Sequence, residues 1–500
     1  MAVKEINFDH AEVVVREERL GSVSQYRGTV YEVAKAGEEV SGGGCGFSDG
    51  DRCFSQNSGC MNGCAQYYLT SIDNVAVVNH APIGCGADFS ANNNSQKWGE
   101  AVQGRPHKDI IDYSTNMQEN DTVFGAADKL TETIRAAYNE NDPDAIFITT
   151  SCVSAVIGED IGSVADNMTA ELGIPVIPVS CEGFKSRIWA SGFDAAFHAL
   201  LTGICKPPRR KTDTVNVINF RGTATPEFYE LFEHLGLTPR LVVAYNTVEE
   251  LSKMPEAIAT VSVCGTLGSY LGNGLEQRYG VPYVKSMQPH GVAGFEDWVR
   301  QLAKATGRTE RGEEFIEKSR EKYLPQIAEL KRELTGIRAV VAMGPGFAFN
   351  FSRVALELGI VLENTHAWHL DTTYDSGRAP ESVRYLARHN PGLRVSVSNL
   401  QYNEVINALA HIRPDLYIYR HPTNSGLIMK LGIPTLSLID EYTAVGYRGL
   451  IEFGRQIKDV MLNRNFEKKL AAKTKLPYTD WWIEQSDPQV FCADGGRANV

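Results

Sequence analysis

The sequence lacks the segments that would direct a chain to a membrane or anchor it there. Its N-terminal stretch, MAVKEINFDHAEVVVREERLGS, has no basic region followed by an apolar one, and no run of about 18 apolar residues occurs in the 500-residue chain. We therefore expect a cytoplasmic protein. Excess positive charge is also absent, because 61 acidic and 49 basic residues give a net charge of −12. This balance argues against a nucleic-acid partner, since phosphate binding depends mostly on cationic side chains.

Disulfide and zinc patterns are absent too, although the chain has ten cysteines. A reducing compartment keeps thiols free, so these cysteines do not predict a disulfide framework. Zinc sites usually have four ligands in CxxC pairs. The close pair in this chain, CMNGC at 60–64, has three residues between its cysteines. The cysteines therefore raise the question of another kind of metal or redox chemistry.

The length and the strand pattern predict an α/β protein with several units. A chain of 500 residues exceeds what one hydrophobic core normally supports. Short β-branched runs alternate with longer helical patterns, which is typical of parallel sheets. The runs form three series: VAVVNHAP, AIFITTSC and PVIPVSC; TVNVINF, PRLVVAY, TVSVCG and PYVKS; RAVVAMGPG, IVLENTHAW, RVSVSN, DLYIYRHP and PTLSLID. We predict three Rossmann-like, doubly wound parallel-sheet domains around a central crevice.

Composition suggests where the domains meet. A basic, proline-rich segment, KPPRRKTDT at 206–214, separates the first and second series, and a charged helical stretch ends near Gly336. The opening residues are glycine-rich and irregular. The predicted organisation is an N-terminal arm, three α/β domains and a C-terminal extension in the third, with boundaries at 1–54, 55–210, 211–335 and 336–500.

Four cysteines lie at or near predicted strand ends. Cys85 in NHAPIGCG, Cys152 in TTSC and Cys264 in VSVCG each follow a strand, and Cys60 lies in the loop SGCMNGC. Ligands of parallel α/β units gather at the carboxyl ends of strands. Glycines beside Cys60 and Cys85 let the backbone approach a bulky cluster and donate N–H groups to sulfide. An incomplete thiolate set indicates a cluster completed by a second chain; the alternative is that each cysteine is a small buried apolar residue.

The other cysteines and three histidines are weaker candidates. Cys181, Cys205 and Cys492 are interpreted as structural, while Cys45, Cys53 and Cys64 are alternatives to Cys60. A single histidine after a strand is most simply a hydrogen-bonded core residue. Histidines grouped at strand ends that face one crevice become candidates for binding, and this applies to His366 and His369 in NTHAWHL and to His421 in YRHPT.

Several longer strings carry a family resemblance: SGC, HAPIGCG, STNMQENDTVFGAADKL, TTSC, SCEGF, VCGTLGSYLGNGLEQRYGVPY and MKLGIPTLSLIDEYTAVGYRGL. From about residue 55 to 480 the chain resembles the α-type (D) subunit of nitrogenase superfamily component 1. The resemblance implies that Cys60, Cys85 and Cys152 bind half of a P-cluster, [8Fe-7S], whose other half lies on a sister β-type (K) subunit. It also implies that Cys264 anchors the terminal iron of a nitrogenase-type iron–sulfur cofactor.

The same resemblance implies two protein partners. One is the sister subunit, in an α2β2 heterotetramer around these metalloclusters. The other is a separate homodimeric iron protein, which holds a [4Fe-4S] cluster, hydrolyses ATP and passes single electrons through the P-cluster to the cofactor.

Departures from the family pattern change the expected reaction. Ile439 stands where nitrogenases carry the histidine that binds molybdenum or its replacement metal, and Thr423 stands near the homocitrate lysine. The pocket histidine and its glutamine neighbour fall near Phe193 and Trp189, and the pocket arginines near Asn93 and Phe347. These changes remove donors and positive charge, so we expect an all-iron cofactor and no dinitrogen reduction. We expect an apolar cavity for a small organic molecule, lined by Trp189, Phe193, Phe347 and Phe349.

Among nitrogenase-like families the chain is most similar to the D subunit of methylthio-alkane reductase. That resemblance implies reductive cleavage of dimethyl sulfide or methylthioethanol to methanethiol and a hydrocarbon. The candidate proton donors, any of which could also replace the missing histidine ligand, are His366, His369, His421 and Asp440. Two alternatives stay open: a scaffold like the α-type member of the nitrogenase maturation complex, and a true nitrogenase α subunit with a relocated ligand.

Overall fold

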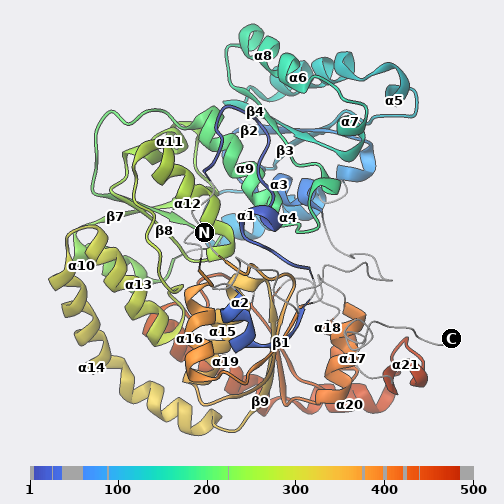
Figure 1. The fold of residues 1–500 in the computed structure, drawn as a ribbon. Helices are drawn as coiled ribbons and strands as arrows, with labels where there is room; N and C mark the ends of the chain where they lie inside the picture. Colours follow the sequence, from blue (N-terminus) through green and yellow to red (C-terminus); the bar gives the residue numbers. More distant parts are fainter. Residues whose placement is uncertain are drawn as a thin grey trace.

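The computed structural model describes residues 5–24, 26–36, 60–86, 89–222, 224–373, 378–397, 402–420, 425–438 and 440–484. Three sheets built mainly of parallel strands, each flanked by helices, confirm the predicted α/β class (Figure 1). No helix in this part of the chain is long and apolar enough to cross a bilayer.

The first sheet, in the upper part of Figure 1, has the strand order β3-β2-β4-β5. Its strands are β2 (Val75–His80), β3 (Ile111–Ser114), β4 (Ala145–Thr150) and β5 (Val176–Val179). Both β2 and β4 are buried along their whole length, because helices cover both faces of the sheet. The helical elements are α3 (Met61–Leu69), η1 (Ile83–Gly86), α4 (Phe89–Val102), α5 (Asp121–Phe124), α6 (Ala127–Asn141), α7 (Cys152–Val156), α8 (Ile161–Leu172), η2 (Gly183–Lys185), α9 (Ser191–Ala199) and η3 (Leu200–Ile204).

The second sheet has the order β7-β6-β8, with β6 (Thr214–Ile218), β7 (Thr238–Val242) and β8 (Ala259–Ser262). The predicted strand PYVKS forms only one bridge, between Tyr283 and Thr260. The chain then leaves the sheet, because the N–H of Met287 donates to Asp297 at 2.8 Å. The helices of this unit are α10 (Pro226–Leu235), α11 (Val248–Ser252), η4 (Met254–Glu256), α12 (Gly265–Tyr279), α13 (Gly291–Ala305) and α14 (Thr309–Leu334).

The third sheet has the order β1-β11-β10-β9-β12-β13. Five strands are parallel: β9 (Arg338–Met343), β10 (Val361–Ala367), β11 (Arg394–Val397), β12 (Leu416–Tyr419) and β13 (Thr435–Ser437). The sixth, β1 (Tyr26–Thr29), comes from the predicted N-terminal arm and pairs antiparallel with β11. The helices are α2 (Val30–Ala36), α15 (Pro345–Glu357), α16 (Glu381–His389), α17 (Tyr402–Ile412), α18 (Ser425–Met429), α19 (Gly446–Leu462), α20 (Asn465–Lys473) and α21 (Asp480–Glu484).

The N-terminal arm also ties the units together. Its short helix α1 (Arg16–Arg19) lies near the centre of Figure 1. The buried Arg16 side chain bonds Asp194 of α9 and the carbonyl of Thr266 in α12. Ser22 donates to Asp371, beyond β10, at 2.6 Å. Segments that belong to all three units therefore meet at this arm. The domain boundaries stay a prediction.

Each sheet has one place where the strand order reverses. These places lie between β2 and β4, between β6 and β8, and between β9 and β12. Loops leaving the carboxyl ends of the two strands diverge there, which opens a crevice where α/β proteins bind ligands. The three reversal points are therefore where functional side chains are expected.

Candidate metal centres

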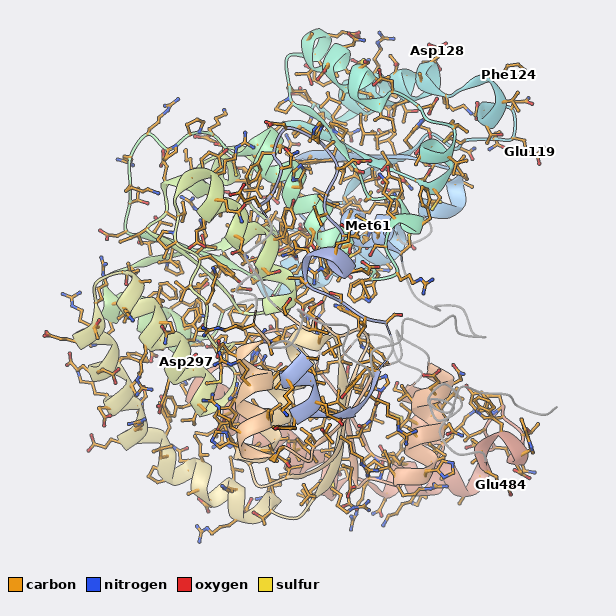
Figure 2. The ribbon with its side chains drawn as sticks, viewed as in Figure 1. Met61, Glu119, Phe124, Asp128, Asp297 and Glu484 are labelled. Carbon is orange, nitrogen blue, oxygen red and sulfur yellow. The ribbon has the colours of Figure 1, made fainter. Side chains whose placement is uncertain are left out.

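Three exposed thiols surround the reversal point of the first sheet. Cys85 lies in η1 after β2, Cys152 begins α7 after β4, and Cys60 immediately precedes α3. Met61, the residue after Cys60, lies toward the middle of the molecule in Figure 2. These are the three cysteines that the sequence predicts as ligands of one cluster.

Gly183, in the string SCEGF, lies against two of these thiols. A β-carbon at this position would lie 3.3 Å from Cys60 Sγ and 3.4 Å from Cys152 Sγ. Burial raises the pKa of Cys85, and the neighbouring Cys60 and Cys152 thiols raise it further, since each would be a like charge. The three sulfur atoms are therefore close enough to influence one another.

The spacing of the thiols does not suit a single ion. Among the described residues, no group of three or more His, Cys, Asp or Glu side chains is placed to hold one metal ion. One ion would hold sulfur ligands about 4 Å apart. The described residues therefore show no single-ion site here, and the shared multi-iron cluster stays a prediction.

An apolar rim borders the three thiols. Ile83, Val156 and Phe184 are 63%, 76% and 58% exposed, and they lie within a few residues of Cys85, Cys152 and Gly183. Phe124 of α5, 85% exposed, projects at the outer edge of the same unit (Figure 2). Exposed apolar side chains gathered around a polar site are typical of a surface that another chain covers.

Three other cysteines are less exposed than these thiols. Cys64 and Cys181 are buried, and Cys205 is partly exposed. Burial raises the pKa of all three thiols, to about 12 for Cys205. Cys45, Cys53 and Cys492 lie outside the described residues.

The second site centres on Cys264, at the reversal point between β6 and β8. Cys264 follows β8, precedes α12 and is 2% exposed. Burial raises the pKa of its thiol to about 11, opposed by the N–H groups of Leu267 and Thr266 and by the charge of Arg420. Both N–H groups belong to the first turn of α12, where such groups have no partner within the helix. Burial therefore disfavours a free thiolate here, whereas the two N–H groups and Arg420 stabilise its negative charge.

A second helix begins beside Cys264. The N–H of Gly346, at the start of α15, donates to Thr266 Oγ1 at 2.9 Å. A β-carbon at Gly346 would lie 3.0 Å from Cys264 Sγ. The glycine at 346 therefore allows α15 to approach the thiol closely.

Aromatic rings extend from this point across the molecule. The ring centroids of Trp189 and Phe193 lie 5.7 Å apart, those of Phe193 and Phe220 also 5.7 Å, and those of Phe220 and Phe347 6.4 Å. Sequence reasoning missed Phe220, which follows β6. Phe349 is buried in the core and stands two residues after Phe347 on α15, so the two side chains point to different sides of the helix.

These rings pack against one another. An apolar cavity lined by them stays a prediction. A cavity of about 240 Å³ does reach Gly265, the residue after Cys264. Its lining is largely polar and includes Ser262, Gln288, Lys285 and Arg378.

Two arginines bring positive charge to the second site. The Arg420 guanidinium lies 4.5 Å from the centre of the Phe347 ring. Arg420 and the fully buried Arg16 both oppose the raised pKa of Cys264. The sequence showed the pocket arginines replaced at Asn93 and Phe347, and it did not predict these two. The signal for Arg420 was its position, directly after a strand.

The four predicted proton donors have different surroundings. His369 is buried, its ring lies 6.2 Å from that of Trp189, and its Nε2 is 3.5 Å from Asp371. His366 belongs to β10, where Ser396 lies 2.9 Å from its Nδ1. Burial raises the pKa of Asp440, which the charge of Arg420 opposes. His421 lies outside the described residues, as do Thr423 and Ile439.

The donor set around Cys264 fits an anionic iron–sulfur group. Arg420 Nη1 and Arg16 Nη1 are buried and have no hydrogen-bond partner within the described part of the chain. A buried donor without a partner costs about 1–3 kcal/mol. Cluster sulfides accept such hydrogen bonds, and a thiolate is a suitable iron ligand.

The chain is similar to several known proteins. Residues 60–462 match the family described as Nitrogenase component 1 type Oxidoreductase. The chain is 26% identical over 458 residues to the nitrogenase iron-molybdenum cofactor biosynthesis protein NifE of Methanococcus maripaludis, covering 89% of this chain and 92% of that protein. It is 25% identical to the nitrogenase molybdenum-iron protein alpha chain of Methanothermobacter marburgensis, covering 82% and 88%.

The solved structure of nitrogenase Cp1 at pH 6.5 has the same fold, with a TM-score of 0.67, 21% identity and coverage of 86% of this chain and 92% of that one. The family match covers both cysteine sites and most of the three sheets. This chain therefore belongs to the nitrogenase component 1 type oxidoreductase family.

Proposed function

We propose that this chain is the cofactor-bearing subunit of a nitrogenase-like reductase that cleaves the carbon–sulfur bond of small methylthio-alkanes. The observation that supports the proposal is the row of packed rings that includes Trp189, Phe193 and Phe347. The resemblance places these three residues near the positions where the family has hydrogen-bonding and charged side chains. A thioether has little hydrogen-bonding capacity, and its sulfur makes favourable contacts with aromatic rings. Dimethyl sulfide and methylthioethanol are the substrates expected.

The exposed thiols would hold the cluster through which electrons enter the chain. Cys60, Cys85 and Cys152 would hold one half of a shared P-cluster, and a sister β-type subunit would cover the apolar rim formed by Ile83, Val156 and Phe184. Two copies of each chain would form the heterotetramer. A separate ATP-dependent iron protein with its own [4Fe-4S] cluster would supply the electrons.

The buried site would serve the reaction. An all-iron sulfur cofactor held by Cys264 would supply electrons at low potential. The aromatic rings exclude water and orient the methyl groups of the substrate, while His369 and Asp440 are the described candidates for holding a proton. For dimethyl sulfide, two electrons and two protons break one carbon–sulfur bond and yield methane and methanethiol in equal amounts.

The test uses the complete two-subunit complex, purified without oxygen and supplied with its iron protein, ATP and dimethyl sulfide. We expect methanethiol and methane in a one-to-one ratio, and loss of both in a Cys264→Ala complex. Cys205→Ala is the matched control, because Cys205 is outside both sites. If the iron-loaded native complex releases no more methanethiol than Cys264→Ala does, the proposed reaction is wrong.

A second candidate function is a cofactor-assembly scaffold. The 26% identity to NifE, over 89% of this chain, favours it. A scaffold hands its cluster on and does not turn over, so the iron-loaded complex would activate a cofactor-free acceptor protein while releasing no methanethiol. Acetylene reduction by the same complex would instead indicate a true nitrogenase α subunit.

A further inference from the structure

Arg420 and Phe347 meet at the reversal point of the third sheet. Phe347 lies in the first turn of α15 after β9, and Arg420 directly follows β12. The N–H of Arg420 donates to the carbonyl of Ala342 in β9 at 3.1 Å, which fixes the residue at the strand end. Its guanidinium carbon lies 4.5 Å from the centre of the Phe347 ring and 5.3 Å from that of Phe220. Arg420 therefore lies at the kind of crevice where α/β proteins bind ligands.

The hydrogen-bonding capacity of Arg420 is only partly used. Its Nη2 lies 3.8 Å from Glu441 Oε2, which is too long for a hydrogen bond. Glu441 instead accepts a hydrogen bond from the N–H of Gly222 at 2.8 Å. Arg420 Nη1 is buried and has no partner among the described residues. A buried guanidinium with an unused donor is suited to an anionic ligand.

Arg420 lies near Cys264 through the start of α15. Its guanidinium packs on the ring of Phe347, and a β-carbon at the preceding residue, Gly346, would lie 3.0 Å from Cys264 Sγ. Sequence comparison placed the family's pocket arginines near Asn93 and Phe347. Asn93 now hydrogen-bonds Asp109 at 2.8 Å. Phe347 has a guanidinium stacked on its ring, and that guanidinium comes from a different strand. A positive charge therefore lies beside one of these two positions, Phe347, and it comes from the residue that follows β12.

We propose that Arg420 holds the anionic iron–sulfur group bound at Cys264, donates a hydrogen bond to it from Nη1 and raises its reduction potential, with Glu441 as the opposing carboxylate. The proposal rests on the proposed function, because it takes Cys264 to carry the cofactor. A nearby cation stabilises the reduced, more negative state more than the oxidised one. A nearby carboxylate has the opposite effect.

The test uses the opposite effects that Arg420 and Glu441 should have on the reduction potential. Complexes carrying Arg420→Gln, Arg420→Lys and Glu441→Gln would be compared with the native complex by iron and sulfide content and by redox titration of the cofactor's electron paramagnetic resonance signal. All complexes would be titrated at the same pH. The control is Arg338→Gln, which removes an arginine at the start of β9 that bonds Glu363 at 2.6 Å.

We expect a more negative midpoint potential in Arg420→Gln and a smaller change in Arg420→Lys, which keeps the charge. Glu441→Gln should shift the potential to more positive values, and Arg338→Gln should leave it unchanged. Loss from Arg420→Gln of the same iron that Cys264→Ala loses would also support the proposal, because it would show that Arg420 holds the group.

A cofactor that keeps its iron and its potential in Arg420→Gln overturns the proposal while leaving the role of Cys264 intact. If Arg420→Gln does not fold, Glu441→Gln decides: a positive shift supports the proposal, and no shift overturns it. Unchanged iron in Cys264→Ala would instead mean that the proposed function fails.

Discussion

A β-carbon placed on Gly346 would lie 3.0 Å from the sulfur of Cys264. The same carbon would lie 2.8 Å from Thr266 Oγ1, the atom that accepts the hydrogen bond from Gly346 N–H. The start of α15 can therefore lie against the thiol only because residue 346 has no side chain. Any side chain there would push α15 away from α12.

Gly346→Ala should lower the amount of iron held at Cys264 and destabilise the protein by about 1–3 kcal/mol, the usual cost of an added carbon in a packed core. Iron and sulfide analysis and thermal unfolding measure the two effects. Gly392→Ala is the control in the same unit, since nothing lies within 4 Å of its added carbon. A Gly346→Ala complex with native iron content would show that the close approach has no role in binding.

Phe184→Ser should weaken association with the sister subunit. Phe184 is 58% exposed and follows Gly183, which touches Cys60 and Cys152. The minority of interface side chains that cost more than about 1 kcal/mol when truncated cluster near the centre of the interface. Because Phe184 lies next to the predicted cluster ligands, we expect the dissociation constant to weaken about tenfold. Sedimentation of mixed subunits measures it. Leu462→Ser, 69% exposed on α19, should have no effect, and equal weakening by both variants would locate the interface elsewhere.

Asp194→Asn should destabilise the chain strongly. Asp194 is fully buried and pairs with Arg16 at 2.7 Å and with Arg19 at 2.9 Å, so its loss leaves two buried cations without their shared carboxylate. Breaking a buried pair in this way costs about 3–5 kcal/mol. Glu171→Gln, which breaks an exposed pair with Arg135, should have a much smaller effect, because water screens exposed ion pairs. Urea unfolding of the metal-free chain measures both, and similar costs would contradict the expectation.

The stability of the chain should fall as the pH rises toward 8, in part because of Glu227. Burial raises the pKa of this carboxyl from 4.5 to about 7, opposed by the N–H groups of Arg448 and Tyr447. Between these values the folded chain binds more protons than the unfolded chain, so raising the pH favours unfolding. The full effect is about 3 kcal/mol.

Glu227→Gln should remove this contribution. Urea unfolding at about pH 5 and about pH 8 would then show a smaller loss of stability in the variant than in the native chain. A native chain whose stability falls no more than that of the variant would show that Glu227 is ionised at little cost in the folded state.

Local sequence predicts most strands of the fold because buried parallel strands are apolar along their length. VAVVNH and AIFITT became β2 and β4, buried at every residue. Two strands were missed. Ile111–Ser114 forms the edge strand β3 and is only partly buried, and Tyr26–Thr29 forms a strand only by pairing with β11, far along the chain.

The candidate site was partly predictable for the same reason. Cys85, Cys152 and Cys264 follow strands, and parallel strands bring their carboxyl ends to one edge of a sheet. The end of β10 separates two other candidates. His366 lies within β10 and contacts Ser396, whereas His369 lies beyond the strand, where its ring is close to that of Trp189. The sequence alone does not show at which residue a strand ends, so it could not separate these two histidines.

The sequence by itself determined the α/β class, the family and the cysteines at strand ends, because these depend on local patterns and on strings of neighbouring residues. Only the tertiary structure decided which charges reach Cys264. Arg16 comes from the N-terminal arm and Arg420 from the third sheet, where its guanidinium packs on Phe220 of the second. Charge and dispersion act between atoms that are close in space, and folding, not sequence order, sets those distances.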